Sequence, residues 1–200
     1  SQVNYQNGVK SGVARQFYRN GKQQKEINYV NGSREGITRV FYEDGALYRE
    51  SPYVNDEITG TLRIYHPNGQ VAAEIPHRKG EPGIGLREYN TKGVEVTESP
   101  KILFKVENKL KSKNKYIVYL SFEGKNRSPE FWFGSPVEGT FLDTDEHVAI
   151  AREGNRYYVE YEVPQGRRLI TTLEVIGQMK SKYKNPYLAA RTLEIDVANR

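Results

Sequence analysis

The chain has 200 residues, a formal net charge of +5 and no cysteine. This length suits one large domain or two small ones, each with its own core. Without cysteine the chain has no disulfide framework, no thiolate metal site and no nucleophilic thiol. Basic residues exceed acidic ones by only 13 to 12 over residues 1–100 and by 17 to 13 over residues 101–200. A nucleic-acid partner is therefore not expected, because such binding needs a clustered basic excess.

Residues 4–98 contain an internal repeat with a period of 24 residues. The repeat consists of short runs of strand-forming residues between Gly- and Asn-containing turns, a pattern typical of a stacked array in which each unit buries its apolar surface against its neighbours. The recurring columns are Gly21, Gly45, Gly69 and Gly93; Arg15, Arg39, Arg63 and Arg87; Glu26, Glu50, Glu74 and Glu98; and Phe17, Phe41, Tyr65 and Tyr89.

Turn dipeptides such as Asn20-Gly21 and Asn31-Gly32 separate the predicted strands. Asn-Gly suits both positive-φ positions of a type I′ turn, so each repeat is predicted to be one antiparallel hairpin. A two-residue turn at Asn20-Gly21 places Arg15 opposite Glu26, and the period carries this register along the chain. The predicted ladder of ion pairs is Arg15 with Glu26, Arg39 with Glu50, Arg63 with Glu74, and Arg87 with Glu98.

Residues 101–200 lack the period, but they still consist of short runs of strand-forming residues separated by Gly, Asn and Pro. They are predicted to form a β-sandwich of immunoglobulin-like size, so the whole chain is expected to be all-β, with a hairpin-repeat domain over residues 1–100 and a sandwich domain over residues 101–200. The strands are predicted at 101–106, 116–122, 130–133, 137–142, 147–151, 157–163, 169–179 and 191–197.

The repeat resembles the MORN-like variant repeat of bacterial proteins, often called the YwqK type. The pattern of an aromatic pair, an acidic residue or Asn, Gly, a Glu-containing strand, Tyr and Asn appears here in the run from Phe41 and Tyr42 through Asp44-Gly45 and Glu50 to Tyr53 and Asn55. The resemblance implies an open antiparallel sheet of four hairpins. It also implies a binding or scaffolding surface, and it brings no catalytic residues.

Neither a catalytic nor a metal site is predicted. The three histidines, His66, His77 and His147, have no partner at metal-ligand or nucleophile spacing, and the chain has no phosphate-binding loop or nucleophile elbow. The acidic run at Asp143, Asp145 and Glu146 is interpreted as a solvated turn in preference to a Ca²⁺ site. No cofactor is expected.

The expected function is that of a non-enzymatic protein-binding or scaffolding module of a bacterial cell. A binder of a cell-envelope carbohydrate polymer or of an anionic lipid surface, and an antitoxin-like partner of a toxin, are the alternatives. Tyr42, Tyr48 and Arg49, beside the central Asp44-Gly45 turn, are the predicted binding residues. The chain begins without Met, which is read as a processed N-terminus and favours a periplasmic or cell-surface location over a cytoplasmic one.

Overall fold

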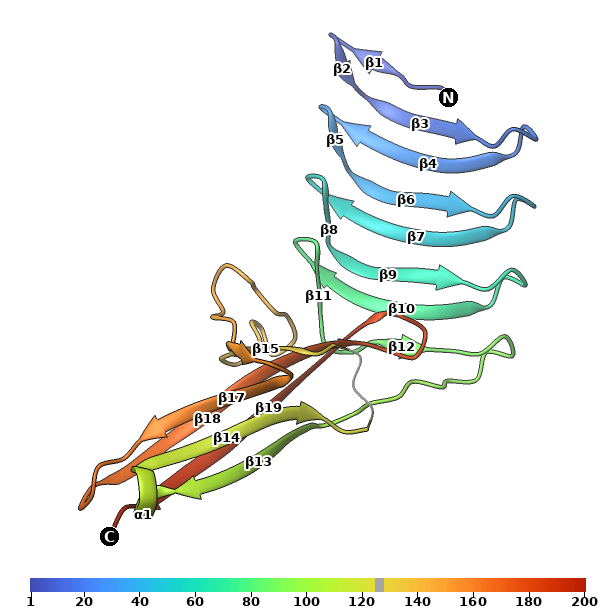
Figure 1. Cartoon of the computed structure of the whole chain (residues 1–200). Helices are drawn as coiled ribbons and strands as arrows, with labels where there is room; N and C mark the ends of the chain where they lie inside the picture. The colour runs from blue at the N-terminus through green and yellow to red at the C-terminus, as the bar shows by residue number, and fades with distance from the viewer. Residues whose placement is uncertain (125–127) are drawn as a thin grey trace. The chain divides into compact units, whose positions relative to one another are not determined.

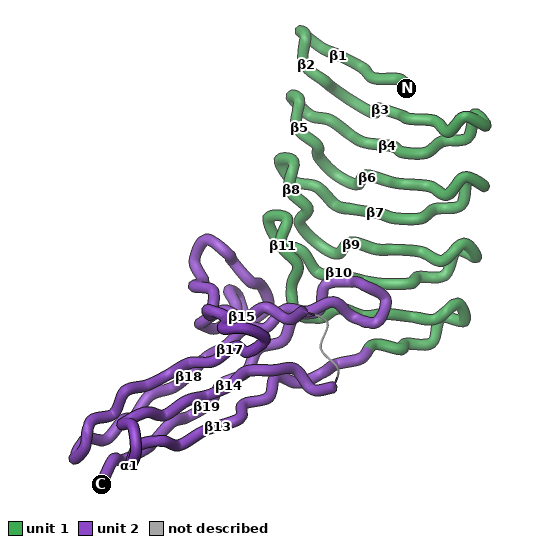
Figure 2. The backbone as a smooth tube through the Cα atoms, viewed as in Figure 1, with its two compact units in different colours: residues 1–97 green, residues 98–200 purple. Residues whose placement is uncertain are grey.

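The computed structural model describes residues 1–124 and 128–200 of the chain. The chain separates into two compact units, residues 1–97 and residues 98–200 (Figure 2). Within the described ranges both units are built from antiparallel strands, and the regular helix present is the single turn α1 (Leu110–Lys113). No helix in the described part of the chain has the length and apolar character needed to cross a membrane.

The first unit is an open antiparallel sheet of hairpins that follow one another along the chain (Figure 1). The main strand order is β11-β10-β9-β7-β6-β4-β3, while β12 pairs with β10, β5 with β4, and β8 with β7. A separate hairpin, β1 with β2, precedes this sheet. The strands are β1 (Tyr5–Gln6), β2 (Val9–Lys10), β3 (Gly12–Phe17), β4 (Gln23–Val30), β5 (Ser33–Arg34), β6 (Gly36–Phe41), β7 (Leu47–Val54), β8 (Glu57–Ile58), β9 (Gly60–Tyr65), β10 (Val71–Arg78), β11 (Glu81–Pro82) and β12 (Arg87–Glu88).

The turns at the two ends of the hairpins differ. Asn31 and Gly32 have φ values of 49° and 90° and join the paired residues Val30 and Ser33, as a two-residue type I′ turn requires. At the opposite end, by contrast, Gly21 has positive φ but Asn20 does not. The type I′ turn predicted at Asn20-Gly21 is therefore wrong.

The turn that forms there is a three-residue loop. The Tyr18 amide donates to the Lys22 carbonyl (2.8 Å), and the Gly21 amide donates to the Tyr18 carbonyl (3.1 Å). A loop of this kind is a type I turn followed by a left-handed residue, which only glycine adopts without strain. The sheet register then shifts by one residue at a bulge beside Phe17. The longer loop and the bulge compensate, so Arg15 still lies opposite Glu26.

Consecutive hairpins are joined by side chains that contact a backbone carbonyl 23 residues further along the chain, in the next repeat. The Tyr18 hydroxyl donates to the Phe41 carbonyl (2.6 Å), and the Tyr42 hydroxyl donates to the Tyr65 carbonyl (2.8 Å). In the next repeat His66 occupies the same column, and its Nε2 lies 2.9 Å from the Tyr89 carbonyl. The column that the sequence shows as Tyr, Tyr, His is thus a series of links between neighbouring hairpins.

The second unit contains two further antiparallel sheets. One has the order β13-β14-β17-β16, and the other has the order β15-β18-β19. Both contribute to one hydrophobic core, in which Val118 and Phe122 of the first sheet meet Phe131 and Val175 of the second, and the Phe122 and Phe131 rings stack at 5.5 Å. The strands are β13 (Ile102–Lys109), β14 (Lys115–Phe122), β15 (Glu130–Phe133), β16 (Arg152–Glu153), β17 (Arg156–Glu162), β18 (Arg168–Lys180) and β19 (Pro186–Ala198).

Two predicted strands of this unit are wrong. Over residues 137–142 the chain turns back on itself, with Glu138 and Gly139 both at positive φ and the Val137 amide bonded to the Phe141 carbonyl. Over residues 147–151 the chain makes only one isolated bridge, between Ala149 and Trp132. Both segments carry apolar residues because they cover the core, and apolar content alone does not separate a buried loop from a strand.

Candidate functional site

A continuous row of alternating charges crosses one face of the repeat sheet. Cross-strand neighbours in the register alternate between Arg and Glu over seven strands, β3, β4, β6, β7, β9, β10 and β12. The charged row consists of Arg15, Glu26, Arg39, Glu50, Arg63, Glu74 and Arg87. Three predicted ion pairs are confirmed, each with an Nε to carboxylate distance of 3.0 Å: Arg15 with Glu26, Arg39 with Glu50, and Arg63 with Glu74.

The fourth predicted ion pair, between Arg87 and Glu98, is wrong. Arg87 instead binds Glu95, with 3.0 Å between Nη2 and Oε2. The last hairpin closes like the others, but the Glu88 amide donates to the side-chain hydroxyl of Thr97 (2.7 Å), so no returning strand continues to Glu98. Arg87 therefore takes the carboxylate that lies nearest the turn.

Tyrosine hydroxyls complete the charged row. The Tyr65 hydroxyl donates to Glu50 Oε2 (2.8 Å), and the Tyr89 hydroxyl donates to Glu74 Oε2 (3.2 Å). Burial, followed by this hydrogen bond to Glu50, raises the pKa of Tyr65. Phe41 occupies the same column one repeat earlier and brings no hydroxyl to Glu26. Because each carboxylate of the confirmed pairs is matched by a neighbouring donor, the charged row serves to hold the sheet together.

The opposite face carries a row of different composition. Side chains alternate between faces along a strand, so the neighbours of the charged row lie on the reverse side. We call this the basic row; it consists of Gln16, Lys25, Val40, Arg49, Ile64, Ala73 and Glu88. Lys25 and Arg49 both lie next to Val40 in the register, and none of the residues paired with them carries a carboxylate.

Two polar atoms on this face are buried without a partner. Within residues 1–124 and 128–200, Arg49 Nε and Ser51 Oγ are the buried side-chain nitrogen and oxygen that make no hydrogen bond. Ser51 follows Arg49 by two positions in β7, so the two side chains share a face. Buried polar atoms are nearly always hydrogen-bonded in folded proteins, and an exception is a candidate for an interaction with something outside the chain.

Burial, together with the positive charges of Arg49 and Arg34, lowers the pKa of Lys25. Arg34 itself is matched, because its Nε binds Asp56 Oδ1 at 2.8 Å and its guanidinium lies over the Tyr53 ring at 4.2 Å. The hydrogen bond to Asp56 raises the pKa of Arg34. By contrast, Lys25 and Arg49 have no acidic partner in the parts of the chain that the structure describes.

Of the three predicted binding residues, Tyr42 links two hairpins, whereas Tyr48 and Arg49 make no such link within the described ranges. Tyr42 is half-buried, bonds the Tyr65 carbonyl and contacts the Tyr48 ring edge-to-face at 5.0 Å. Tyr48 is 36% exposed. Arg49 belongs to the basic row. Sequence reasoning missed Lys25, although Lys25 and Arg49 are 24 residues apart and so share one repeat column.

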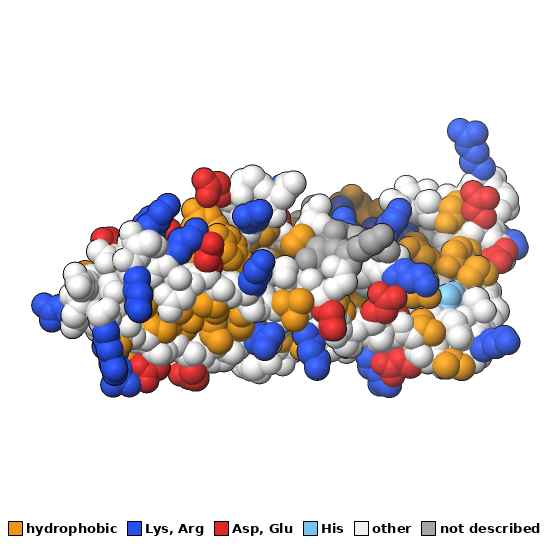
Figure 3. All heavy atoms as spheres, turned by 60° about the horizontal axis from the view of Figure 1, so that its bottom comes forward, with side chains coloured by type: hydrophobic (Ala, Val, Ile, Leu, Met, Phe, Trp, Pro, Cys, Tyr) orange, Lys and Arg blue, Asp and Glu red, His pale blue; other side chains and the backbone are white. Residues whose placement is uncertain are grey.

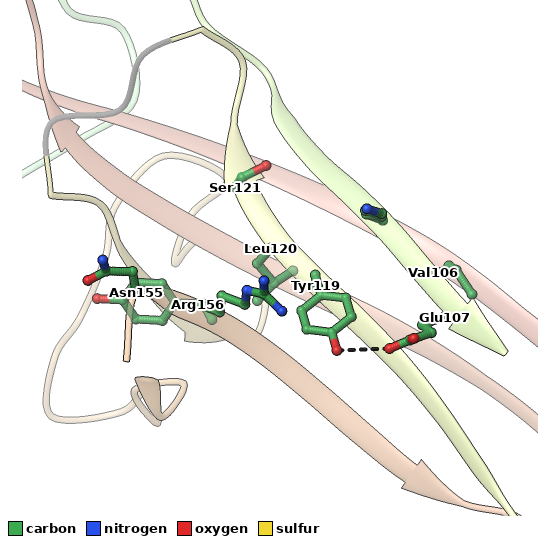
Figure 4. Close-up of a pocket in the computed structure, with 9 residues that line it drawn as sticks. Val106, Glu107, Tyr119, Leu120, Ser121, Asn155 and Arg156 are labelled. Atoms are coloured by element: carbon green, nitrogen blue, oxygen red, sulfur yellow. Dashed lines mark hydrogen bonds between the residues drawn. The ribbon is translucent and has the colours of Figure 1, made fainter. Parts of the chain in front are cut away.

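The second unit has an open hollow of about 410 Å³ beside β13, β14 and β17 (Figure 4). Within it the Tyr119 hydroxyl points toward Glu107 and donates to Oε2 (3.0 Å), and the Arg156 guanidinium lies 5.9 Å from the Tyr119 ring centre. Hydrogen bonds from Lys109 and then Tyr119 lower the pKa of Glu107. The polar groups that Figure 4 joins already satisfy one another, as expected of a surface network.

No group of three or more His, Asp or Glu side chains in the described ranges is placed to hold a metal ion. The histidine rings contact backbone carbonyls instead: His77 Nδ1 lies 3.0 Å from the Ile75 carbonyl, and His147 Nε2 lies 2.8 Å from the Ser135 carbonyl. On the molecular face drawn in Figure 3, acidic and basic side chains are interspersed.

Comparison with known families assigns the repeat. The model of the MORN repeat variant matches residues 10–31, 34–55 and 58–79, three copies that follow each other at the 24-residue period. The chain thus carries the MORN repeat variant over residues 10–79, and its C-terminal part is unassigned. Neither a curated protein nor a solved structure matched the chain.

Proposed function

We propose that this chain is a non-enzymatic protein-binding or scaffolding module of a bacterial cell, and that the basic row of the repeat sheet contacts its partner. One observation supports this most strongly. In a sheet whose other face matches Arg with Glu strand by strand, Lys25 and Arg49 stand together without a carboxylate, and Arg49 Nε is buried unpaired. Binding of a partner is favourable when the partner supplies the acceptor that these cations lack.

The charged row is the weaker choice for a binding surface. Its guanidinium groups already donate to glutamates at 3.0 Å, so a partner would have to compete with these contacts. An open sheet is nevertheless suited to a macromolecule. Strands about 4.8 Å apart provide, over the seven strands of the row, enough area for the roughly 800 Å² that each side of a standard protein interface buries.

The finer architecture belongs to the same proposal. We take residues 84–98 as a fourth, irregular hairpin that ends the repeat, since Tyr89 and Glu95 close its turn as Phe17 and Gln23 close the first. We take the second unit as a β-sandwich of immunoglobulin-like size, supported by the core that its two sheets share. A periplasmic or cell-surface location remains part of the proposal.

Site-specific photo-crosslinking tests the function. A photo-reactive amino acid replaces Tyr48, an exposed residue beside the basic row, and a control variant carries it at Ile170, which is 69% exposed in the second unit. Illumination of cells that make the protein should give a discrete adduct with one other protein at position 48 and none at position 170. Adducts with polysaccharide or lipid, equal labelling at both positions, or a catalytic turnover by the purified chain would each overturn the proposal.

A further inference from the structure

We infer that Lys25 and Arg49 form a carboxylate-binding site, and that the segment of the partner that docks there is acidic. The inference rests on the proposed function and adds the chemistry of the partner to it. It depends on where these two side chains lie, on what surrounds them, and on what they do not contact.

The register places the two cations on either side of one apolar residue. Lys25 in β4 pairs with Val40 in β6, and Val40 pairs with Arg49 in β7. Neighbouring strands lie about 4.8 Å apart, so the two cations start from backbone positions roughly 10 Å apart. Both side chains are long enough to converge above Val40. A carboxylate held there accepts from the ammonium group on one side and from the guanidinium fork on the other.

The donors of this site are otherwise unused. In the parts of the chain that the structure describes, neither Lys25 nor Arg49 makes a side-chain hydrogen bond or ion pair with another residue. Arg49 Nε and Ser51 Oγ are buried and unpaired on the same face of β7. A carboxylate accepts through both oxygens and has room for several donors at once, so it suits a guanidinium group beside an ammonium group. Ser51 is fully buried and is not a contact of the partner.

The surroundings favour an extended segment with more than one carboxylate. The positions adjacent to Lys25 and Arg49 on neighbouring strands are Gln16, Val40 and Ile64, which add no negative charge. The lowered pKa of Lys25 has burial as its first cause, followed by the positive charges of Arg49 and Arg34.

In β4, the strand of Lys25, the centre of the Tyr29 ring lies 5.0 Å from Lys10 Nζ. In β7, the strand of Arg49, the centre of the Tyr53 ring lies 4.2 Å from Arg34 Cζ. Lys10 therefore extends the positive charge beyond the two cations, whereas the charge of Arg34 is matched by Asp56. A strip of this kind is complementary in charge to an acidic peptide and longer than a single small anion requires.

Binding of a labelled peptide to the full chain tests the inference. The probe is a fluorescein-labelled peptide that alternates Glu and Ser, the matched probe carries Gln for Glu, and the readout is fluorescence anisotropy at low salt. Lys25→Gln and Arg49→Gln should each weaken binding of the Glu peptide by about tenfold, since each removes one charge-assisted contact. Arg63→Gln, a cation of the charged row, is the matched control and should change binding less than about twofold.

Val40→Glu provides a second, independent variant. It places a resident carboxylate between Lys25 and Arg49, so it should abolish peptide binding while leaving the melting temperature unchanged or higher. Circular dichroism of every variant separates loss of binding from loss of fold. Unaltered peptide binding in Val40→Glu, or equal losses in Arg49→Gln and Arg63→Gln, overturns the inference.

Two further arms decide between sources of the negative charge. Inorganic phosphate that displaces the peptide completely at the peptide's own concentration identifies a small-anion site and overturns the peptide assignment. Equal binding of the Gln peptide overturns the carboxylate assignment. If crosslinking at position 48 persists in Lys25→Gln and Arg49→Gln, the proposed protein-binding function is supported and the carboxylate site is refuted. If the peptide binds but no protein is crosslinked, the carboxylate site is supported and the proposed function is refuted.

Discussion

Phe41→Tyr should stabilise the repeat sheet. In the following two repeats the residue in this column is tyrosine, and its hydroxyl donates to the glutamate of the preceding repeat, at 2.8 Å for Tyr65 and 3.2 Å for Tyr89. A hydroxyl added to Phe41 by the same geometry meets Glu26. Glu26 Oε2 already accepts from Arg15 at 3.0 Å, while Oε1 has only the longer 3.5 Å contact with Arg39. The new donor therefore finds an acceptor with capacity to spare.

The size of the effect follows from burial. A hydrogen bond to a charged group contributes about 1.5–3 kcal/mol when it is well shielded, and less when solvent competes. The side chain of Glu26 is 22% exposed and Phe41 is half-buried, so we expect a gain of about 0.5–1.5 kcal/mol in the free energy of unfolding. For a unit of this size a gain of about 1 kcal/mol raises the melting temperature by roughly 4–8 °C. Tyr65→Phe, the reverse change one repeat later, should lose a similar amount.

Urea unfolding measured with two probes isolates the effect. Far-UV circular dichroism follows both units, whereas the single tryptophan, Trp132, is buried in the second unit and reports on that unit by its fluorescence. Phe41→Tyr should shift the unfolding transition of the first unit to a higher urea concentration and leave the transition seen by tryptophan fluorescence unchanged. In a Glu26→Ala background the gain should vanish. A gain that survives Glu26→Ala, or a loss of stability in Phe41→Tyr with an equal loss in Tyr65→Phe, refutes the reasoning.

Three further predictions concern the two units. Gly177→Ala should destabilise the second unit by about 1–3 kcal/mol in urea unfolding, because an added Cβ meets the rings of Phe122 and Phe131 at 2.8 Å. Burial lowers the pKa of His77, so between that pKa and about 6.5 the unfolded chain binds a proton that the folded chain does not, and the stability of the first unit falls as the pH drops. His77→Tyr should remove this loss of thermal stability on mild acidification. Residues 98–200 produced alone should unfold cooperatively, and a non-cooperative transition would contradict their separation as a compact unit.

Periodicity explains how much of the first unit could be predicted from the sequence. A repeat fixes which residues share a column. The pairs from Arg15–Glu26 to Arg63–Glu74 were predicted from a two-residue turn that does not form, and they hold because the bulge compensates for the longer loop. The turn was wrong because Asn-Gly suits two loop geometries, and the bulge that corrects the register has no residue signature of its own. The last pair failed because Thr97 replaces the returning strand with a side-chain hydrogen bond.

The candidate site was less accessible to sequence reasoning. Arg49 was selected for its place beside a turn, but Lys25 becomes its neighbour only through the pairing of three strands. The buried, unpaired Nε of Arg49 is likewise not revealed by composition or spacing. In the second unit, where no period supports the assignment, apolar runs that form core-covering loops could not be separated from strands.

The lateral contacts of the charged row make the sheet extensible in whole units. Glu26 binds an arginine of its own hairpin and one of the next, so a duplicated 24-residue segment would join on both sides without a new interface. Each duplication lengthens the sheet by two strand spacings, about 10 Å. The first edge is already covered, because Gln2 and Arg15 exchange two backbone hydrogen bonds of 2.8 Å. Duplication of a segment within the array would therefore need no new interface, and copy number would set the span of the sheet.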